Sequence, residues 1–188
     1  MTSKPELPLL PICIIGPSGC GKSTIVTDLV RRELAHIAPS WTDRPRRPGE
    51  EPLEHVFVSS IEFDHAEADQ TFLGVVKPFD LPYRYGLPVL QLEPGVPTIV
   101  MLRAPFVATF RTFYPTAPVY QIEASFKFAE EAVWARNDSE TGSRLSGFEK
   151  ELTLGRAVAS RILVNDGKEI EALADQIFEW AKNDIARL

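Results

Sequence analysis

Residues 16–23 read GPSGCGKS, and this short stretch is the strongest structural signal in the chain. It matches the pattern G-x-x-x-x-G-K-[ST], in which a glycine-rich turn joins a buried strand to a helix. Before it, residues 12–15 (ICII) form a β-branched run that suits a buried parallel strand. After it, Ile25, Leu29 and Val30 recur at helical spacing. Because both flanks agree with the motif, we predict a strand, a phosphate-binding loop and a helix in that order.

A loop of this kind binds the phosphates of ATP or GTP. Its glycines let backbone N–H groups turn towards phosphate oxygens, its lysine reaches the β- and γ-phosphates, and the hydroxyl residue that follows ligates magnesium. The helix that begins there adds the positive end of its dipole. The candidate nucleotide-binding residues in the loop are Gly16, Ser18, Gly19, Gly21, Lys22, Ser23 and Thr24, with Lys22 also catalytic and Ser23 the candidate metal ligand.

The rest of the chain alternates between apolar runs and helical patterns. Short strands are predicted from Val56 and at residues 98–102, 119–122 and 162–164. Helices are predicted after Ser59, through Phe106, Phe110 and Phe113 as far as about Pro115, and at residues 128–134, 148–159 and 170–185. Ser59 and Glu62 form a capping-box signature. Residues 72–88 mix aromatic and β-branched residues with Pro and Gly, which indicates a small antiparallel flap. This alternation predicts an α/β fold with a parallel sheet and helices on both of its faces.

The composition of the chain argues against several classes of binding partner. The 188 residues carry 20 basic and 26 acidic side chains, a formal net charge of -6, which argues against nucleic acid or an anionic membrane as a general partner. The two cysteines, Cys13 and Cys20, are too few for a disulfide framework and fit a reducing cytosol. The apolar stretch at residues 7–15 is broken by prolines and is shorter than a membrane span. We therefore expect a cytoplasmic protein that does not bind membranes.

A second cluster of charge lies at residues 40–50, SWTDRPRRPGE, and it interrupts an otherwise acidic chain. Arg44, Arg46 and Arg47 alternate with Pro45 and Pro48, a spacing that a merely solvated loop does not need. The planar guanidinium of arginine donates two hydrogen bonds to a phosphate. This stretch therefore predicts a local anion site.

The two anion motifs occur in an order that resembles the guanylate kinase family. The pattern S-x-T-x-R-x-x-R-P-G-E follows the phosphate-binding loop and precedes a strand F-V-S at residues 57–59. The resemblance continues at residues 95–98, in F-Y-P at residues 113–115 and in V-N-D at residues 164–166, so it covers almost all of the chain from Ile12 onward.

The resemblance implies an architecture and a set of site residues. It implies a single domain over residues 1–188, with a core at about 10–39 and 89–188, an acceptor-binding flap at about 40–88 and a lid at about 136–147. In the flap, Ser40, Arg44, Arg47 and Tyr85 match residues that hold the acceptor monophosphate. In the lid, Arg136 and Arg144 match catalytic arginines, and Asn165 matches a residue near the adenine of the donor.

The implied activity is phosphoryl transfer from ATP, with Mg²⁺ as cofactor, to a small phosphorylated acceptor, by default GMP. The expected partners are therefore ATP and this acceptor. An acceptor phosphate is already an ionised nucleophile at neutral pH, so the reaction needs no general base.

Three positions depart from the family at the places where it reads guanine. Gly74 stands where the family has an acid, Leu87 where it has a hydroxyl residue and Arg103 where it has an aspartate at the end of a strand. Losing such buried polar matches can cost factors of roughly 10⁴ in discrimination. His55 replaces a flap tyrosine, and it and Arg103 are further candidate acceptor-binding residues. Two alternatives stay open: a sugar-phosphate kinase resembling the ribose 1,5-bisphosphate kinases, and a catalytically weak module that binds phosphorylated partners.

Overall fold

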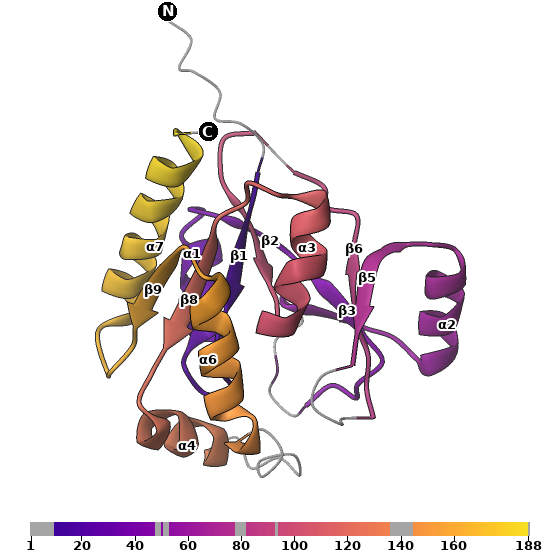
Figure 1. Ribbon diagram of the computed structural model, residues 1–188, viewed down its shortest axis with the longest axis horizontal. Coiled ribbons are helices and arrows are strands. Elements are labelled where there is room, and N and C mark those ends of the chain that lie inside the picture. Colours follow the sequence, from indigo (N-terminus) through magenta and orange to yellow (C-terminus); the bar gives the residue numbers. More distant parts are fainter. Residues whose placement is uncertain are drawn as a thin grey trace, which may run out of the picture.

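The computed structural model describes residues 10–47, 50, 53–77, 82–92, 94–135 and 145–187. Strands and helices alternate along most of this chain (Figure 1). The strands are β1 (Pro11–Ile15), β2 (His36–Ala38), β3 (Ser40–Thr42), β4 (His55–Phe57), β5 (Phe72–Val76), β6 (Tyr85–Pro88), β7 (Thr98–Met101), β8 (Val119–Glu123) and β9 (Arg161–Val164). The helices are α1 (Lys22–Arg31), α2 (Ser60–Ala68), the 3-10 helix η1 (Ala104–Phe106), α3 (Val107–Phe113), α4 (Phe126–Trp134), α6 (Phe148–Val158) and α7 (Ile170–Ile185).

The central sheet has five strands in the order β2-β7-β1-β8-β9, and every neighbouring pair is parallel. Strand β1 lies in the middle, between β7 and β8, and all of its residues are buried. This position explains its continuous apolar sequence, because a parallel strand that is covered on both faces has no polar side.

Helices cover both faces of this sheet, as Figure 1 shows. Ile12 and Ile14 of β1 belong to a core cluster with α1 and α7, whereas Cys13 and Ile15 belong to a second cluster with α3. Helix α6 lies on the same face as α3, because a side chain at Gly155 would meet Gln121 of β8 and Ile15. The alternation of β1 side chains thus builds two separate cores, one on each face.

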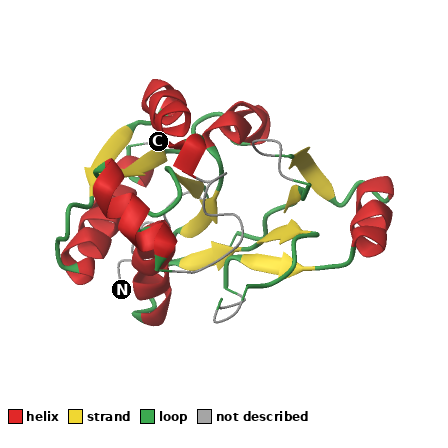
Figure 2. Ribbon diagram, turned by 90° about the horizontal axis from the view of Figure 1, so that it is seen from below, coloured by secondary structure: helices red, strands yellow, loops and turns green. Residues whose placement is uncertain are grey.

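A second, smaller sheet extends from one side of the central sheet (Figures 1 and 2). Its order is β4-β3-β6-β5, with β3 and β4 parallel and the other pairs antiparallel. The rings of Trp41, Phe72 and Phe63 pack against one another and attach α2 to this sheet. Helix α2 begins with the predicted capping box: Glu62 N–H donates to Ser59 Oγ and Ser59 N–H donates to the Glu62 carboxylate.

These observations confirm the predicted fold class, including the mainly antiparallel small sheet in the segment assigned to the flap. Strands β2 and β3 were not predicted. Ala38 pairs with Val100 in the central sheet and Ser40 pairs with His55 in the small sheet, so the chain passes from one sheet to the other across Pro39. Within the described ranges, none of the helices combines the length and the apolar character that a membrane crossing requires.

Candidate active site

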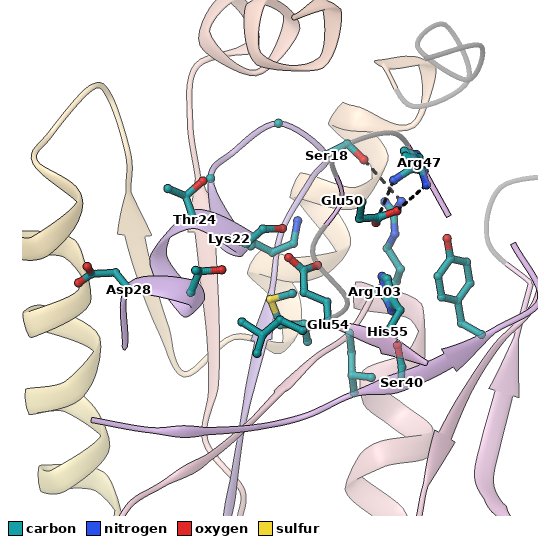
Figure 3. A pocket seen from close by; sticks show the side chains of 18 of the residues that line it. Ser18, Lys22, Thr24, Asp28, Ser40, Arg47, Glu50, Glu54, His55 and Arg103 are labelled. Atoms are coloured by element: carbon teal, nitrogen blue, oxygen red, sulfur yellow. Dashed lines mark hydrogen bonds and ion pairs between the residues drawn. The ribbon is translucent and has the colours of Figure 1, made fainter. Parts of the chain in front are cut away.

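A single cavity of about 970 Å³ joins the phosphate-binding loop to the small sheet. It lies where β1 and β7 end, which is the edge at which parallel sheets bind their ligands. Figure 3 shows Lys22 and Thr24 towards one end of this cavity and Arg47, His55 and Ser40 towards the other. Of the predicted site residues, it is lined by Ser18, Gly19, Gly21, Lys22, Ser23, Thr24, Ser40, Arg44, Arg47, His55, Tyr85 and Arg103.

The loop has the backbone conformation that phosphate binding needs. Gly16 and Gly21 have φ of 143° and 89°, which side chains rarely tolerate. A Cβ at Gly16 would lie 2.2 Å from the carbonyl oxygen of Ile122, so the loop can turn here only with glycine. Gly21 is the N-cap of α1 and offers no side-chain cap, which leaves the first N–H groups of the helix available to an anion.

Lys22 closes over the loop. Its Nζ donates to the carbonyl oxygens of Gly16 at 2.6 Å and Pro17 at 2.8 Å. These bonds hold the ammonium group beside the N-terminus of α1. Ser23 and Thr24 follow in the first turn of the helix and also line the cavity.

Asn165 is hydrogen-bonded to the backbone of the phosphate-binding loop. Its side chain is buried, and its Nδ2 donates to the carbonyl oxygen of Cys20 at 3.0 Å. Cys20 is itself buried, its Sγ donates to the carbonyl oxygen of Pro17, and burial raises the pKa of its thiol. Asn165 does not line the cavity wall described here, so its contact with the nucleotide stays a prediction.

Arg44 is the centre of the predicted second anion site. Its side chain is only 2% exposed and lies over the ring of Phe57. Its Nε donates to the hydroxyl of Tyr85 at 3.1 Å, and its two terminal nitrogens donate to the two carboxylate oxygens of Glu50 at 2.9 and 2.6 Å. A guanidinium with this number of fixed partners has one orientation, which is the property that phosphate recognition requires.

Glu50 joins the two predicted arginines. Besides Arg44, it accepts from the backbone N–H of Arg47 at 3.1 Å, and its carboxylate lies 3.6 Å from the Arg47 guanidinium. Burial acts to raise the pKa of Glu50, but the hydrogen bonds and charges of Arg44 and Arg47 outweigh it and lower that pKa below its ordinary value. Glu50 therefore stays ionised at neutral pH and keeps this pair of arginines in place.

His55 lies beside the arginine grip, which is the pair Arg44 and Arg47 held together by Glu50. Its Nδ1 lies 2.8 Å from Ser40 Oγ, and its ring packs edge-on against Tyr85. Burial, and then the charge of Arg44, lower the pKa of His55 to about 4. The imidazole is therefore neutral at physiological pH, and it acts as a hydrogen-bonding group rather than as a cation.

This buried histidine predicts a loss of stability in mild acid. The unfolded chain binds a proton at His55 below about pH 6.5, whereas the folded chain does so only below about pH 4. Between these values the unfolded state binds more protons, so the free energy of unfolding falls as the pH decreases, by on the order of 3 kcal/mol for this residue. Urea unfolding at pH 7 and pH 4.5 measures the loss.

Replacing His55 with phenylalanine, which keeps a ring but cannot be protonated, should make this loss of stability smaller. The exposed His65 of α2 provides the matched control, because His65→Gln should leave the loss unchanged. An equal loss of stability in wild type and His55→Phe would contradict the assignment.

Arg103 follows the end of β7 and faces both halves of the cavity. One of its terminal nitrogens donates to Glu151 of α6 at 2.6 Å, and the other lies 3.5 Å from Ser18 Oγ in the phosphate-binding loop. The Glu151 side chain is 2% exposed. Glu151 was not among the predicted site residues, because it lies far from the motifs along the chain.

Comparison with known proteins identifies the family. No family model matches the chain. The guanylate kinase of Nostoc sp. (strain PCC 7120 / SAG 25.82 / UTEX 2576) is 33% identical over 138 residues, which cover 69% of this chain and 68% of that protein. The chain belongs to the guanylate kinase family. The guanylate kinase of Thermobifida fusca (strain YX) is 38% identical over 91 residues, a match that spans 45% of that protein's length.

Solved structures agree on the fold. The guanylate kinase from Anaplasma phagocytophilum superposes with a TM-score of 0.69 at 22% identity and covers 95% of this chain and 88% of its own. A shikimate kinase from Acinetobacter baumannii gives a TM-score of 0.51 at 14% identity and covers 95% of this chain and 96% of its own. This guanylate kinase family member therefore has the fold of a P-loop kinase.

Two of the departures from the guanylate kinase pattern lie in packed surroundings. A Cβ at Gly74 would lie 2.8 Å from both the Phe106 ring and the Thr109 methyl group, so the position has no room for a side chain. Leu87 is fully buried in the core cluster that contains Phe106. The cavity wall on this side includes the apolar residues Val76, Met101, Leu102 and Phe106.

The remaining predicted site residues cannot be placed. Arg136 and Arg144, the two lid arginines that the resemblance implies, lie outside the described residues.

Proposed function

We propose that this guanylate kinase family member transfers the γ-phosphoryl group of ATP to a phosphomonoester. The observation that carries this proposal is a single cavity that contains both a complete phosphate-binding loop and a preorganised arginine grip. Each feature alone could bind an anion, and two such sites that open into one cavity can hold a phosphoryl donor and a phosphorylated acceptor next to each other.

The residues of the cavity have separate roles in this reaction. The loop amides and Lys22 bind the β- and γ-phosphates of ATP, and Lys22 offsets charge on the transferred group. Arg44, Arg47, Ser40 and Tyr85 hold the acceptor phosphate in line with it. The acceptor oxygen is already ionised, which agrees with a neutral His55 that needs to remove no proton. Arg136 and Arg144 remain part of the proposal as lid arginines.

Magnesium fits this site as a partner of ATP. The Ser23 hydroxyl, which lines the cavity beside Lys22, is the group that would hold it. The described part of the chain contains no group of three or more His, Cys, Asp or Glu side chains that could hold a metal ion. This is consistent with an ion held largely by substrate phosphates. When bound, Mg²⁺ offsets charge on the β- and γ-phosphates.

GMP is the first candidate acceptor, because the relatives from Nostoc and Thermobifida fusca are both named guanylate kinases. A sugar phosphate is the second candidate, and one observation favours it. At position 74 the Phe106 ring and Thr109 leave no space for a guanine-reading carboxylate, and Leu87 turns into the core instead of presenting a hydroxyl to the cavity. A guanine base would therefore meet apolar surroundings at the two positions, 74 and 87, where the family pattern has polar side chains.

We therefore predict that GMP turns over poorly compared with its turnover by an ordinary guanylate kinase. A coupled assay of ADP release over GMP, other nucleoside monophosphates and pentose phosphates should show roughly 10²-fold or lower discrimination between guanine and other bases, because the polar contacts that supply larger factors are missing. Vigorous turnover that is selective for guanine would show that this interpretation of Gly74 and Leu87 is wrong.

Titration calorimetry with magnesium-ATP tests the proposed function directly. A phosphotransferase should bind the nucleotide, and the Lys22→Ala variant should bind it more weakly. A module that only binds phosphorylated partners through Arg44 and Arg47 has no need for the loop. No detectable binding at millimolar ATP would therefore reject the enzyme and favour the binding module.

A further inference from the structure

Arg103 lies at the boundary between the two phosphate sites. It extends from the segment just after β7, whereas the residues of the arginine grip come from the small sheet and the loop after β3. One terminal nitrogen reaches Ser18 of the phosphate-binding loop, at 3.5 Å. Its positive charge also acts on His55, in the acceptor half of the cavity. Arg103 therefore faces the space between a bound donor and a bound acceptor.

Glu151 holds Arg103 there. The carboxylate lies in the first turn of α6, where the helix dipole favours a negative charge. Its Oε2 accepts from Arg103 at 2.6 Å, and its Oε1 has no hydrogen-bond partner among the described residues. A carboxylate that is 2% exposed needs such a cation, and in return it limits where the guanidinium can point.

We propose that Arg103 is a catalytic residue that contacts the phosphoryl group during transfer, and that Glu151 is its positioning residue. This inference rests on the proposed phosphotransferase function. In the reaction, an acceptor phosphate oxygen forms a bond to the γ-phosphorus, the bond to the bridging oxygen breaks, and its electron pair leaves with ADP. Arg103 donates hydrogen bonds to the oxygens of the phosphoryl group that is being transferred, and it neither gains nor loses a proton.

The arrangement favours this role over simple acceptor binding. Arg44 and Arg47 already supply the cations for the acceptor phosphate, and Glu50 orients both of them. Arg103 is oriented separately, from the other sheet, and it points to the loop that holds the donor. A hydrogen-bond donor at that point stabilises the charge that builds up on the γ-phosphoryl oxygens as the bond breaks. It therefore lowers the free energy of the transition state more than that of the ground state.

The test compares wild type with Arg103→Ala, Arg103→Lys, Glu151→Gln and the double variant Arg103→Ala/Glu151→Gln. The double variant avoids a buried carboxylate without a partner, and Arg103→Lys keeps a cation beside it. With the best acceptor of the substrate panel, Arg103→Ala and the double variant should lose kcat by about 10²-fold or more, with ATP affinity within about threefold of wild type. Lysine should restore only part of the rate, because it lacks the planar fork.

Two further measurements separate the proposed roles of Glu151 and Arg103 from a general disturbance of the fold. Glu151→Gln should lower kcat on its own but have no further effect in the Arg103→Ala background, because it acts through Arg103. ADP, aluminium fluoride and acceptor together should form a slowly dissociating complex with wild type but not with Arg103→Ala. This second readout does not depend on turnover.

Arg156→Ala provides the matched control. Like Arg103, Arg156 pairs with a buried glutamate, Glu123, but it extends from α6 and does not line the cavity. It should change thermal stability without lowering kcat. If Arg103→Ala changes kcat no more than Arg156→Ala does, or changes only the KM for the acceptor, the inference is wrong while the proposed function stands. If wild type phosphorylates no acceptor in the panel, the proposed function itself fails, and this inference fails with it.

Discussion

Replacing Arg44 with alanine is expected to lower kcat/KM for the acceptor by about 10²- to 10⁴-fold while ATP affinity stays within about threefold. The reason is geometric. Arg44 is oriented by Tyr85 and by both oxygens of Glu50, so its loss removes a fixed cation from the acceptor half of the cavity and frees the carboxylate that also positions Arg47. Initial rates at varied acceptor concentration and calorimetry with magnesium-ATP measure the two quantities.

Arg46→Ala is the matched control for this prediction. Arg46 lies in the same loop but is exposed, and its Nε donates to the backbone carbonyl of Glu50. It should leave kcat/KM within about threefold of wild type.

An equal loss of ATP affinity in Arg44→Ala would contradict the assignment of Arg44 to the acceptor half. Because its side chain is buried, Arg44→Ala should also destabilise the fold by on the order of 3 kcal/mol.

Replacing Lys22 with methionine should lower kcat by about 10³-fold and weaken ATP binding. Methionine keeps the length of the side chain but cannot donate to the carbonyl groups of Gly16 and Pro17 or to a phosphate. The backbone of the loop and the N-terminus of α1 remain, so some nucleotide affinity should survive. Single-turnover rates with saturating ATP separate the loss of chemistry from the loss of binding.

Lys182→Ala is the control for a lost positive charge. Lys182 is half exposed on α7 and pairs with Glu179, away from the cavity. It should leave both kcat and ATP affinity unchanged. A Lys22→Met variant with the activity of Lys182→Ala would exclude the loop from the reaction.

Local sequence was sufficient where a structural element depends on its own residues. The side chains of Ser59 and Glu62 each accept a hydrogen bond from the backbone N–H of the other residue, within one helical turn. This capping box begins α2 as predicted. The boundaries of α7 were also predicted correctly, because its buried residues recur at helical spacing over its whole length. The phosphate-binding loop belongs to the same class, since all its residues are contiguous.

Strands β2 and β3 could not be predicted in this way. Each is only three residues long, and Pro39 separates them. Their strand character comes from pairing: β2 adds to β7 of the central sheet, and β3 lies between β4 and β6 of the small sheet. Short edge and connecting strands of this kind depend on distant partners rather than on a local pattern.

The sequence by itself predicted two phosphate-binding motifs, because each motif carries its own chemistry within a few residues of chain. Only the tertiary structure decided that both motifs open into one cavity and that Arg103 lies between them. Arg103 and Glu151 are 48 positions apart, and their ion pair exists only because α6 packs against η1, which directly follows Arg103. Charge pairing across a fold depends on distance in space, which no spacing along the chain reveals.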